Sequence, residues 1–200
     1  MSGLVKQVTG TDDDRPTPDI GGRTRRVLEQ FRKASKQAEA CLANEEYQQA
    51  MALFFEASQS ANEMHERFLS LMMKTAPTAA HRSLVLEVLG WRLRYFTAQY
   101  DYHLAVAQTL QGLPREEWVA RLETILVLSQ SLVSSLLPIL KEVKEPNIRR
   151  RIEELLSDWV IGVERLVSYL KIWNMASAQA SRVLEWAYDN GLAVPFGVQK

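Results

Sequence analysis

Residues able to perform metal or nucleophilic chemistry are few and widely spaced in this chain. It has one cysteine, Cys41, and three histidines, His65, His81 and His103. A zinc site needs closely spaced cysteine and histidine ligands, and a di-iron site in a helical bundle needs glutamate three residues before histidine. Neither pattern occurs, and neither does a phosphate loop or a nucleophile elbow. We therefore expect no metal, no cofactor, no catalytic residues and no enzyme, although two carboxylates brought together by the fold would escape this test.

Clustered basic residues point instead to phosphate binding. Residues 23–36 contain six basic residues against Glu29, whereas residues 37–66 contain six acidic residues and no basic one. Either two helices neutralise each other across a hairpin, or the basic strip contacts the phosphates of a nucleic acid. Three further arginines stand at a predicted helix start, where the helix dipole disfavours cations unless Glu153 and Glu154 compensate. The candidate phosphate contacts are Arg23, Arg25, Arg26, Arg32, Lys33, Lys36, Arg149, Arg150 and Arg151.

Aromatic residues and arginines alternate between Trp91 and His103. Single-stranded nucleic-acid binders stack bases on aromatic rings and follow the backbone with arginine. The same residues also repeat with helical spacing, on two stripes that include Trp91 and Tyr100. That spacing favours a central helix with core on both sides, whose arginines extend to solvent.

The elements that position these residues are predicted to be helices. From Arg23 onward apolar residues recur every three or four positions, with no convincing alternation of period two. We predict an all-α fold, an antiparallel bundle of five to six helices over 23–191, with an irregular N-terminal arm over 1–22 and a short tail over 192–200. Helices should begin near Thr24, Tyr47, Thr78, Pro114 and Ile148, with 174–190 either a sixth helix or a continuation of the fifth. Proline inside the fourth helix should kink or break it near Leu137.

Composition is that of one ordinary globular domain. The chain has 200 residues, of which 46% are hydrophobic and 24% charged, and its formal net charge is zero. The balanced charge gives no general attraction to nucleic acid or membranes. The lone cysteine and the absence of a signal peptide favour a cytoplasmic protein. We predict that the most apolar run, Ile125–Leu140, is a buried core helix and not a membrane span, because it is short and contains serines and Pro138.

Residues 31–60 resemble a single tetratricopeptide-type helical hairpin, or the similar helical pair of a microtubule-interacting and trafficking module. The matching residues are Ala38, Tyr47, Ala50, Phe54 and Ala57. The resemblance implies two helices in close contact through alanines, and it identifies no ligand. The first helix lacks the usual tryptophan and Leu–Gly pair, and no second copy follows about 34 residues later, so an array of repeats is not expected.

The longest apolar seam follows the fifth predicted helix, from Ile148 to Trp173, with spacings of three or four residues. Gly162 beside it should let a neighbouring backbone come close. Because surplus apolar surface marks partner sites, we expect a non-enzymatic interaction or assembly protein that packs helix faces with itself, as a homo-oligomer, or with a larger complex, and not with a membrane. The alternative is a helical subunit that coats or clamps nucleic acid through the strip from Arg23 to Lys36. The candidate partner face is Ile152, Trp159, Val163, Leu166, Leu170 and Trp173.

Overall fold

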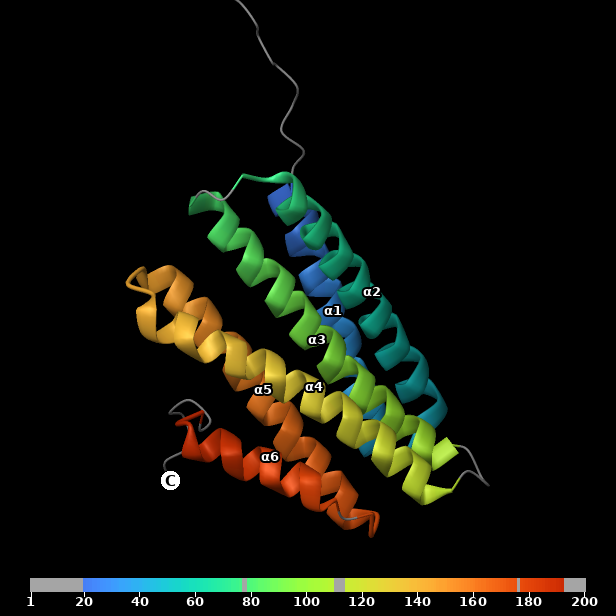
Figure 1. The fold of residues 1–200 in the computed structure, drawn as a ribbon. Coiled ribbons are helices and arrows are strands. Elements are labelled where there is room, and N and C mark those ends of the chain that lie inside the picture. Colours follow the sequence, from blue (N-terminus) through green and yellow to red (C-terminus); the bar gives the residue numbers. More distant parts are fainter. Residues whose placement is uncertain (1–19, 77–78, 110–113, 176, 193–200) are drawn as a thin grey trace, which may run out of the picture.

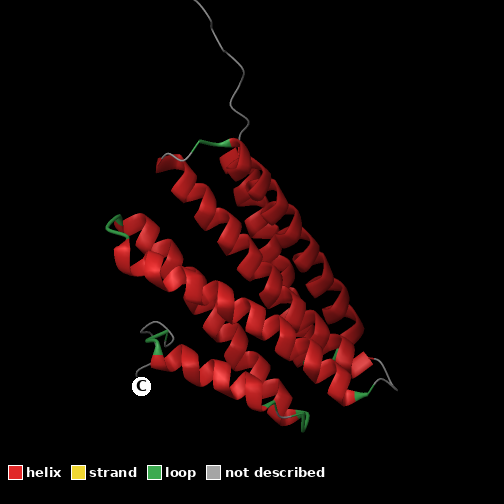
Figure 2. Ribbon diagram, in the orientation of Figure 1, coloured by secondary structure: helices red, strands yellow, loops and turns green. Residues whose placement is uncertain are grey.

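The computed structural model describes residues 20–76, 79–109, 114–175 and 177–192. Within these ranges every regular element is an α-helix (Figure 2). The all-α prediction is therefore confirmed. The elements are α1 (Ile20–Ala43), α2 (Tyr47–Lys74), α3 (Ala79–Thr109), α4 (Arg115–Glu142), α5 (Pro146–Ile172) and α6 (Ala178–Asp189).

The helices form two groups that share α3. On one side α2 packs along α3 and α1 packs on α2, while on the other side α4 and α5 contact α3, and α6 lies against both α4 and α5 (Figure 1). The long helices run back and forth, because short connections place successive helices next to each other. The result is a bundle in which α3 is the element common to both halves.

Two apolar faces of α3 explain its central position. Leu86, Leu93, Tyr100 and Leu104 are buried in a large core with α4, α5 and α6. The other face meets α1 and α2 through residues that include Val88 and Trp91. A helix that is apolar on two sides must be covered on two sides, and the sequence predicted this arrangement.

The α1–α2 hairpin packs through small residues. Ala38, Ala50 and Ala57 have at most 1% of their surface exposed, and the buried Phe54 ring lies with Ala38 and Ala50 in one apolar cluster. Alanine at these positions lets the two helix backbones come close, so the spacing seen in the sequence reflects packing inside the hairpin.

Two close contacts fix α5 on its neighbours. A Cβ added at Gly162 would lie 3.0 Å from the Tyr100 hydroxyl and 3.2 Å from Thr97 Cγ2, so the glycine is what lets α5 approach α3. Trp159 is fully buried, and its Nε1 donates a hydrogen bond of 3.0 Å to the Ser129 hydroxyl of α4. A close approach at Gly162 is therefore present, but the atoms nearest to it belong to side chains of α3 and not to a backbone as predicted. The buried indole of Trp159 has its partner.

Three helices end with a residue in the left-handed region. Gly191 has φ of 71° after α6, while Glu45 and Asn174 have φ of 63° and 53° after α1 and α5. Each end carries the two backbone hydrogen bonds of a Schellman motif, such as Glu46 N–H to Cys41 C=O at 2.8 Å. Glu45 adopts this conformation without the freedom of glycine, and asparagine tolerates it better.

Several predicted boundaries differ from the structure. Helix α1 begins at Ile20 and not near Thr24, and α4 continues through Pro138 without a break. Of the two alternatives left open for residues 174–190, the structure shows the separate sixth helix. The rest of the predicted arm, residues 1–19, and residues 193–200 of the tail lie outside the described residues.

Replacing Glu45 with glycine should stabilise the protein. Glycine removes the Cβ strain at positive φ, so we expect Glu45→Gly to raise the free energy of unfolding by about 0.5–1 kcal/mol in urea denaturation. Asn44→Gly, one residue earlier at a position with no positive φ, is the matched control and should lower it. If Glu45→Gly lowered the free energy of unfolding as much as Asn44→Gly does, the strain assigned to Glu45 at positive φ would be contradicted.

Candidate functional site

The seam of α5 is part of the internal core, and its assignment as a partner face is wrong. Five of its residues have at most 2% of their surface exposed, among side chains of α3, α4 and α6. Trp173 is partly buried and its ring lies 6.3 Å from that of Tyr47 in α2. The heptad-like spacing is used for packing within the chain, because the bundle surrounds α5. The five residues are Ile152, Trp159, Val163, Leu166 and Leu170.

Exposed apolar surface lies instead on α4. Its inner side chains, among them Leu126 and Leu136, are fully buried, but Val127 and Leu128 are 44% and 51% exposed. The predicted buried core helix is therefore wrong for one side of the run. We call the solvent side the outer face of α4; its exposed residues are Thr124, Val127, Leu128, Ser131, Ser134, Ser135 and Pro138.

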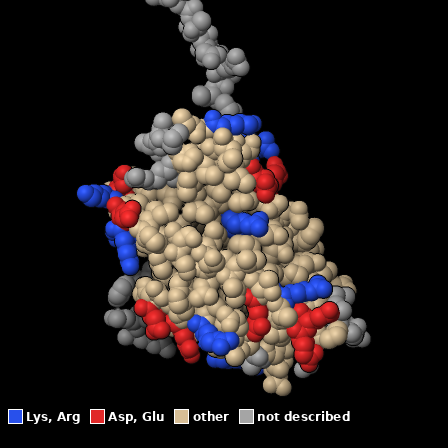
Figure 3. Space-filling model, in the orientation of Figure 1, with Lys and Arg blue, Asp and Glu red and all other residues tan. Residues whose placement is uncertain are grey.

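The outer face of α4 carries no charge. No charged residue occurs between Glu123 and Lys141. The space-filling view shows α4 within a broad area free of charged side chains, with charges near the ends of the helix (Figure 3). Among the described residues, α4 is also the one helix long and apolar enough to cross a membrane by length and composition, a property shared by core helices of soluble proteins.

The basic strip of α1 faces solvent and is largely unpaired. Arg23 contacts Glu63 of α2 at 3.2 Å, which is the neutralisation across the hairpin that the charge pattern suggested. Among the described residues, however, no other basic residue of the strip has an acidic partner within 4 Å. All of them are exposed: Arg25, Arg26, Arg32, Lys33 and Lys36.

The second basic patch is neutralised. Arg149 and Arg150 pair with glutamates four residues later, Glu153 at 3.6 Å and Glu154 at 3.0 Å, and Arg151 pairs with Glu87 of α3. Arg149 also donates a hydrogen bond of 3.2 Å to the Leu140 carbonyl, one of the free carbonyls at the end of α4. These arginines therefore have structural partners, which weakens their assignment as phosphate contacts.

The aromatic and arginine residues of α3 pair with each other. The Arg92 guanidinium lies 4.9 Å from the ring centres of both Tyr95 and Phe96, and that of Arg94 lies 5.0 Å from the ring centre of Trp91. These cation–π contacts cover aromatic faces on which a base would have to stack. The structure favours the core interpretation of this segment.

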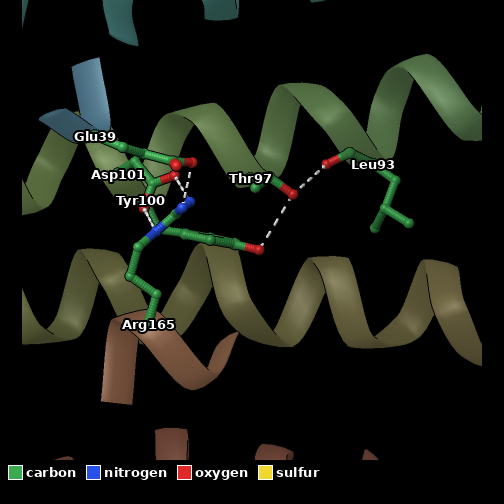
Figure 4. Close-up of polar contacts among 6 residues, drawn as sticks. All are labelled: Glu39, Leu93, Thr97, Tyr100, Asp101 and Arg165. Carbon is green, nitrogen blue, oxygen red and sulfur yellow. Dashed lines mark hydrogen bonds and ion pairs between the residues drawn. The ribbon is translucent and has the colours of Figure 1, made fainter. Parts of the chain in front are cut away.

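A buried ionic cluster joins α1, α3 and α5 (Figure 4). Arg165 of α5 donates two hydrogen bonds to the carboxylate of Asp101, one of them 3.3 Å from Nε, and another to Glu39. The Asp101 side chain is 2% exposed, whereas those of Arg165 and Glu39 are 20% and 42% exposed. The bidentate geometry fixes the orientation of α5 against α3.

Burial and pairing act against each other in this cluster. Burial raises the pKa of Asp101 to about 6, a rise that Arg165 opposes and Glu39 reinforces. For Arg165, burial lowers the pKa but Asp101 and Glu39 outweigh it and raise it above the usual value. The arginine therefore stays charged, while Asp101 takes up a proton under mildly acidic conditions.

A cavity of about 170 Å³ adjoins this cluster between α1, α3 and α5. Its charged lining includes Asp158 and Arg94 in addition to the cluster, and its apolar wall includes Phe31 and Ile161. Among the described residues no group of three or more histidine, cysteine or acidic side chains is placed to hold a metal ion. The cavity therefore offers charge recognition and an apolar wall.

Sequence reasoning missed Asp101 and Arg165. They are 64 residues apart, and nothing in their local pattern distinguishes them from ordinary surface charges. One usable signal was the position of Asp101, directly after Tyr100 on a helix predicted to be central. A charged residue on a helix covered from two sides needs a partner from a neighbouring helix.

The pKa of Asp101 predicts a pH dependence of stability. Because the pKa of Asp101 is raised in the folded protein, its contribution to stability is fully present at pH values below the ordinary pKa of aspartate. That contribution is lost as the pH rises through about 6. Asp101→Asn lacks this titration. We therefore expect the free energy of unfolding of the wild type, relative to that of Asp101→Asn, to increase by about 2 kcal/mol when the pH is lowered from 7 to 4.5. Urea denaturation at the two pH values measures it. Glu39→Gln, which removes the other partner of Arg165, is the control; a pH-independent difference for Asp101→Asn would contradict the assignment.

Comparison with known proteins identifies no relative of this chain. No protein-family model matches it, and neither a curated protein nor a solved structure resembles it significantly.

Proposed function

We propose that this protein is a non-enzymatic assembly protein that associates with a second copy of itself through the outer face of α4. The observation that carries the proposal is the absence of charge on a solvent-facing helix surface that includes Val127 and Leu128. Apolar surface that is exposed on a helix is removed from water when another helix packs on it.

The helix dipole of α4 favours an antiparallel pair. Glu116 and Glu117 are exposed in the first turn, whereas at the other end Lys141 and Lys144 are exposed together with Glu142 and Glu145. In a two-fold pair Glu116 and Glu117 of one copy face the end of the other copy that carries the two lysines, and the helix dipoles oppose each other. A two-fold axis places similar residues opposite each other, and an uncharged central surface avoids the repulsion that like charges would cause.

The size of this face sets the expected strength of association. From Glu117 to Lys141 the helix is about 36 Å long, and at a width of about 10 Å it offers roughly 360 Å² per copy. Two copies would bury about 700 Å², below the 1,200–2,000 Å² typical of stable complexes. We therefore expect a reversible dimer that forms at high micromolar concentration. Serines on the face allow the two backbones to approach closely.

Leu128→Glu should abolish this association. Placing two carboxylates near a two-fold axis introduces repulsion and removes the most exposed leucine, so we expect dimerisation to weaken by at least about tenfold, equivalent to ~1.4 kcal/mol. Light scattering after size-exclusion chromatography over a concentration series measures it.

Met73→Glu is the matched control, because Met73 is 77% exposed on α2, outside the outer face of α4. It should dimerise as the wild type does. A wild-type protein that stays monomeric at high micromolar concentration, or equal effects of the two substitutions, would refute the proposal.

A second candidate function is binding of nucleic acid through α1. It is favoured by the exposed basic residues of α1 that have no acidic partner among the described residues, in contrast to Arg149, Arg150 and Arg151. Arg26 and Lys33 are seven residues apart, or two turns, so their side chains project from the same side of the helix about 10 Å apart. Such a row could follow successive phosphates.

Reversing the charges of Arg25, Arg26 and Lys33 to glutamate tests this candidate. If these residues contact phosphates, binding to a fluorescent oligonucleotide should weaken by at least about 100-fold, and the slope of log affinity against log salt should fall by about 3. Arg150→Glu, at a paired arginine, should change binding far less. Binding that is independent of salt, or unaltered by the triple reversal, would exclude the candidate.

A further inference from the structure

A second cavity, of about 120 Å³, lies between the same three helices as the first. Three residues line both cavities: Arg32 of α1, Arg94 of α3 and Asp158 of α5. The two cavities therefore meet on either side of one group of charged side chains. We call the combined space the Arg94 cleft.

Arg94 is a guanidinium that lacks a counterion. Among the described residues it forms no ion pair within 4 Å and no hydrogen bond within the chain, and its contact is with the face of Trp91. Burial lowers its pKa to about 10, Glu87 and Asp158 oppose this only in part, and Arg32 and Arg151 add to it. An arginine at this pKa remains charged at neutral pH, so the cleft holds a partly exposed cation whose N–H donors have no acceptor within the described part of the chain.

A second orphan donor lines the cleft. Trp91 is 1% exposed and its Nε1 has no hydrogen-bond partner among the described residues. Three other buried side-chain nitrogens share this property, those of His81, His103 and Trp118. What distinguishes Trp91 is its position beside the guanidinium of Arg94, so that two donors without partners line the same cleft.

Gly90 makes room for this arrangement. A Cβ at Gly90 would lie 3.4 Å from Arg94 Nη1 and 3.0 Å from Leu155 Cδ1. Without a side chain at this position, the Arg94 head can lie over the preceding turn of α3, beside Leu155 of α5. The position of the guanidinium is therefore supported by the backbone and by α5.

Carboxylates around Arg94 limit the negative charge that a ligand can carry. The two linings together contain four arginines and five carboxylates, so the cleft has no excess of positive charge. Arg165 is paired with Asp101 and Glu39, Arg151 with Glu87, and Glu154 with Arg150. Arg32, Arg94 and Asp158 are left without an ion pair within 4 Å among the described residues. A monoanion on Arg94 meets less repulsion from Asp158 than a dianion such as phosphate does.

We propose that the Arg94 cleft binds a small organic carboxylate. Arg94 takes the carboxylate in bidentate hydrogen bonds, and the hydrocarbon part of the ligand lies in the first cavity against Phe31, Ala98 and Ile161. At about 170 Å³ this cavity is of the size that accommodates one aromatic ring, since a cavity of about 150 Å³ binds benzene. The cleft involves α1, α3 and α5 and not the outer face of α4, so the site is independent of dimerisation.

Calorimetric titration of the full chain with benzoate tests the proposal, with benzyl alcohol as the neutral analogue and inorganic phosphate as the alternative anion. We expect saturable binding of benzoate, and at least about tenfold weaker binding of either comparison compound. No saturable binding of benzoate, or tighter binding of phosphate, would overturn the assignment to a carboxylate.

Variants of Arg94 locate the binding. Arg94→Met should weaken benzoate binding by at least about tenfold, and Arg94→Lys, which keeps the charge but not the fork, by an intermediate factor. Trp91→Phe keeps the ring and loses the donor, so binding should weaken by about fivefold. Arg92→Met, which stands outside both cavities, is the control and should bind as the wild type does.

Folding of each variant is checked by its thermal unfolding. Removing a partly buried charge that has no ion pair should not lower the stability of Arg94→Met. Should that variant unfold, Arg94→Lys decides the question by itself. Wild-type affinity for benzoate in a folded Arg94→Met or Arg94→Lys protein would refute the site, and Leu128→Glu should retain full benzoate binding whatever its effect on dimerisation.

Discussion

The structure depends on the burial of α3 on two sides. Its apolar residues form two faces, one toward α1 and α2 and the other toward α4, α5 and α6. A helix of this kind is unstable unless both faces are covered, because each exposed apolar face costs about 25 cal/mol per Å². Covering both joins the two halves into one bundle. Every charged side chain that α3 carries near these faces must then find a partner, or a cavity, at the junction.

At the junction of α1, α3 and α5, charged side chains of α3 are buried next to charged side chains of the neighbouring helices. Asp101 and Arg165 satisfy each other in a bidentate pair, and Glu39 adds a third charge from α1. Removing one partner of such a pair is more costly than the pair is stabilising, since the other charge stays buried. The pair thus selects one arrangement of α5 against α3. Arg94, two turns earlier on α3, has no such partner among the described residues, and it lines the two cavities at this junction.

Two surfaces within the described part of the chain carry the proposed functions. The outer face of α4 is uncharged and exposes Val127 and Leu128, while α1 exposes a basic strip. Binding at the outer face of α4 would be driven by removing apolar area from water. Binding at the basic strip of α1 would be driven by the release of counterions from a nucleic acid. The first has the geometry for a pair of like helices. The second depends on salt, so the two proposed functions are separable in solution.

The sequence by itself determined the helical fold, the central place of α3 and the close approach at Gly162. These follow from spacing along one helix, because a period of 3.6 residues assigns each side chain to a face. Spacing does not tell which apolar face is covered by the chain itself. The seam from Ile148 to Trp173 and the run Ile125–Leu140 were therefore assigned the wrong way round: the structure buries the first and exposes part of the second. Only the tertiary structure decided this, and only it paired Asp101 with Arg165, because contacts between residues far apart in the chain depend on how the helices pack together.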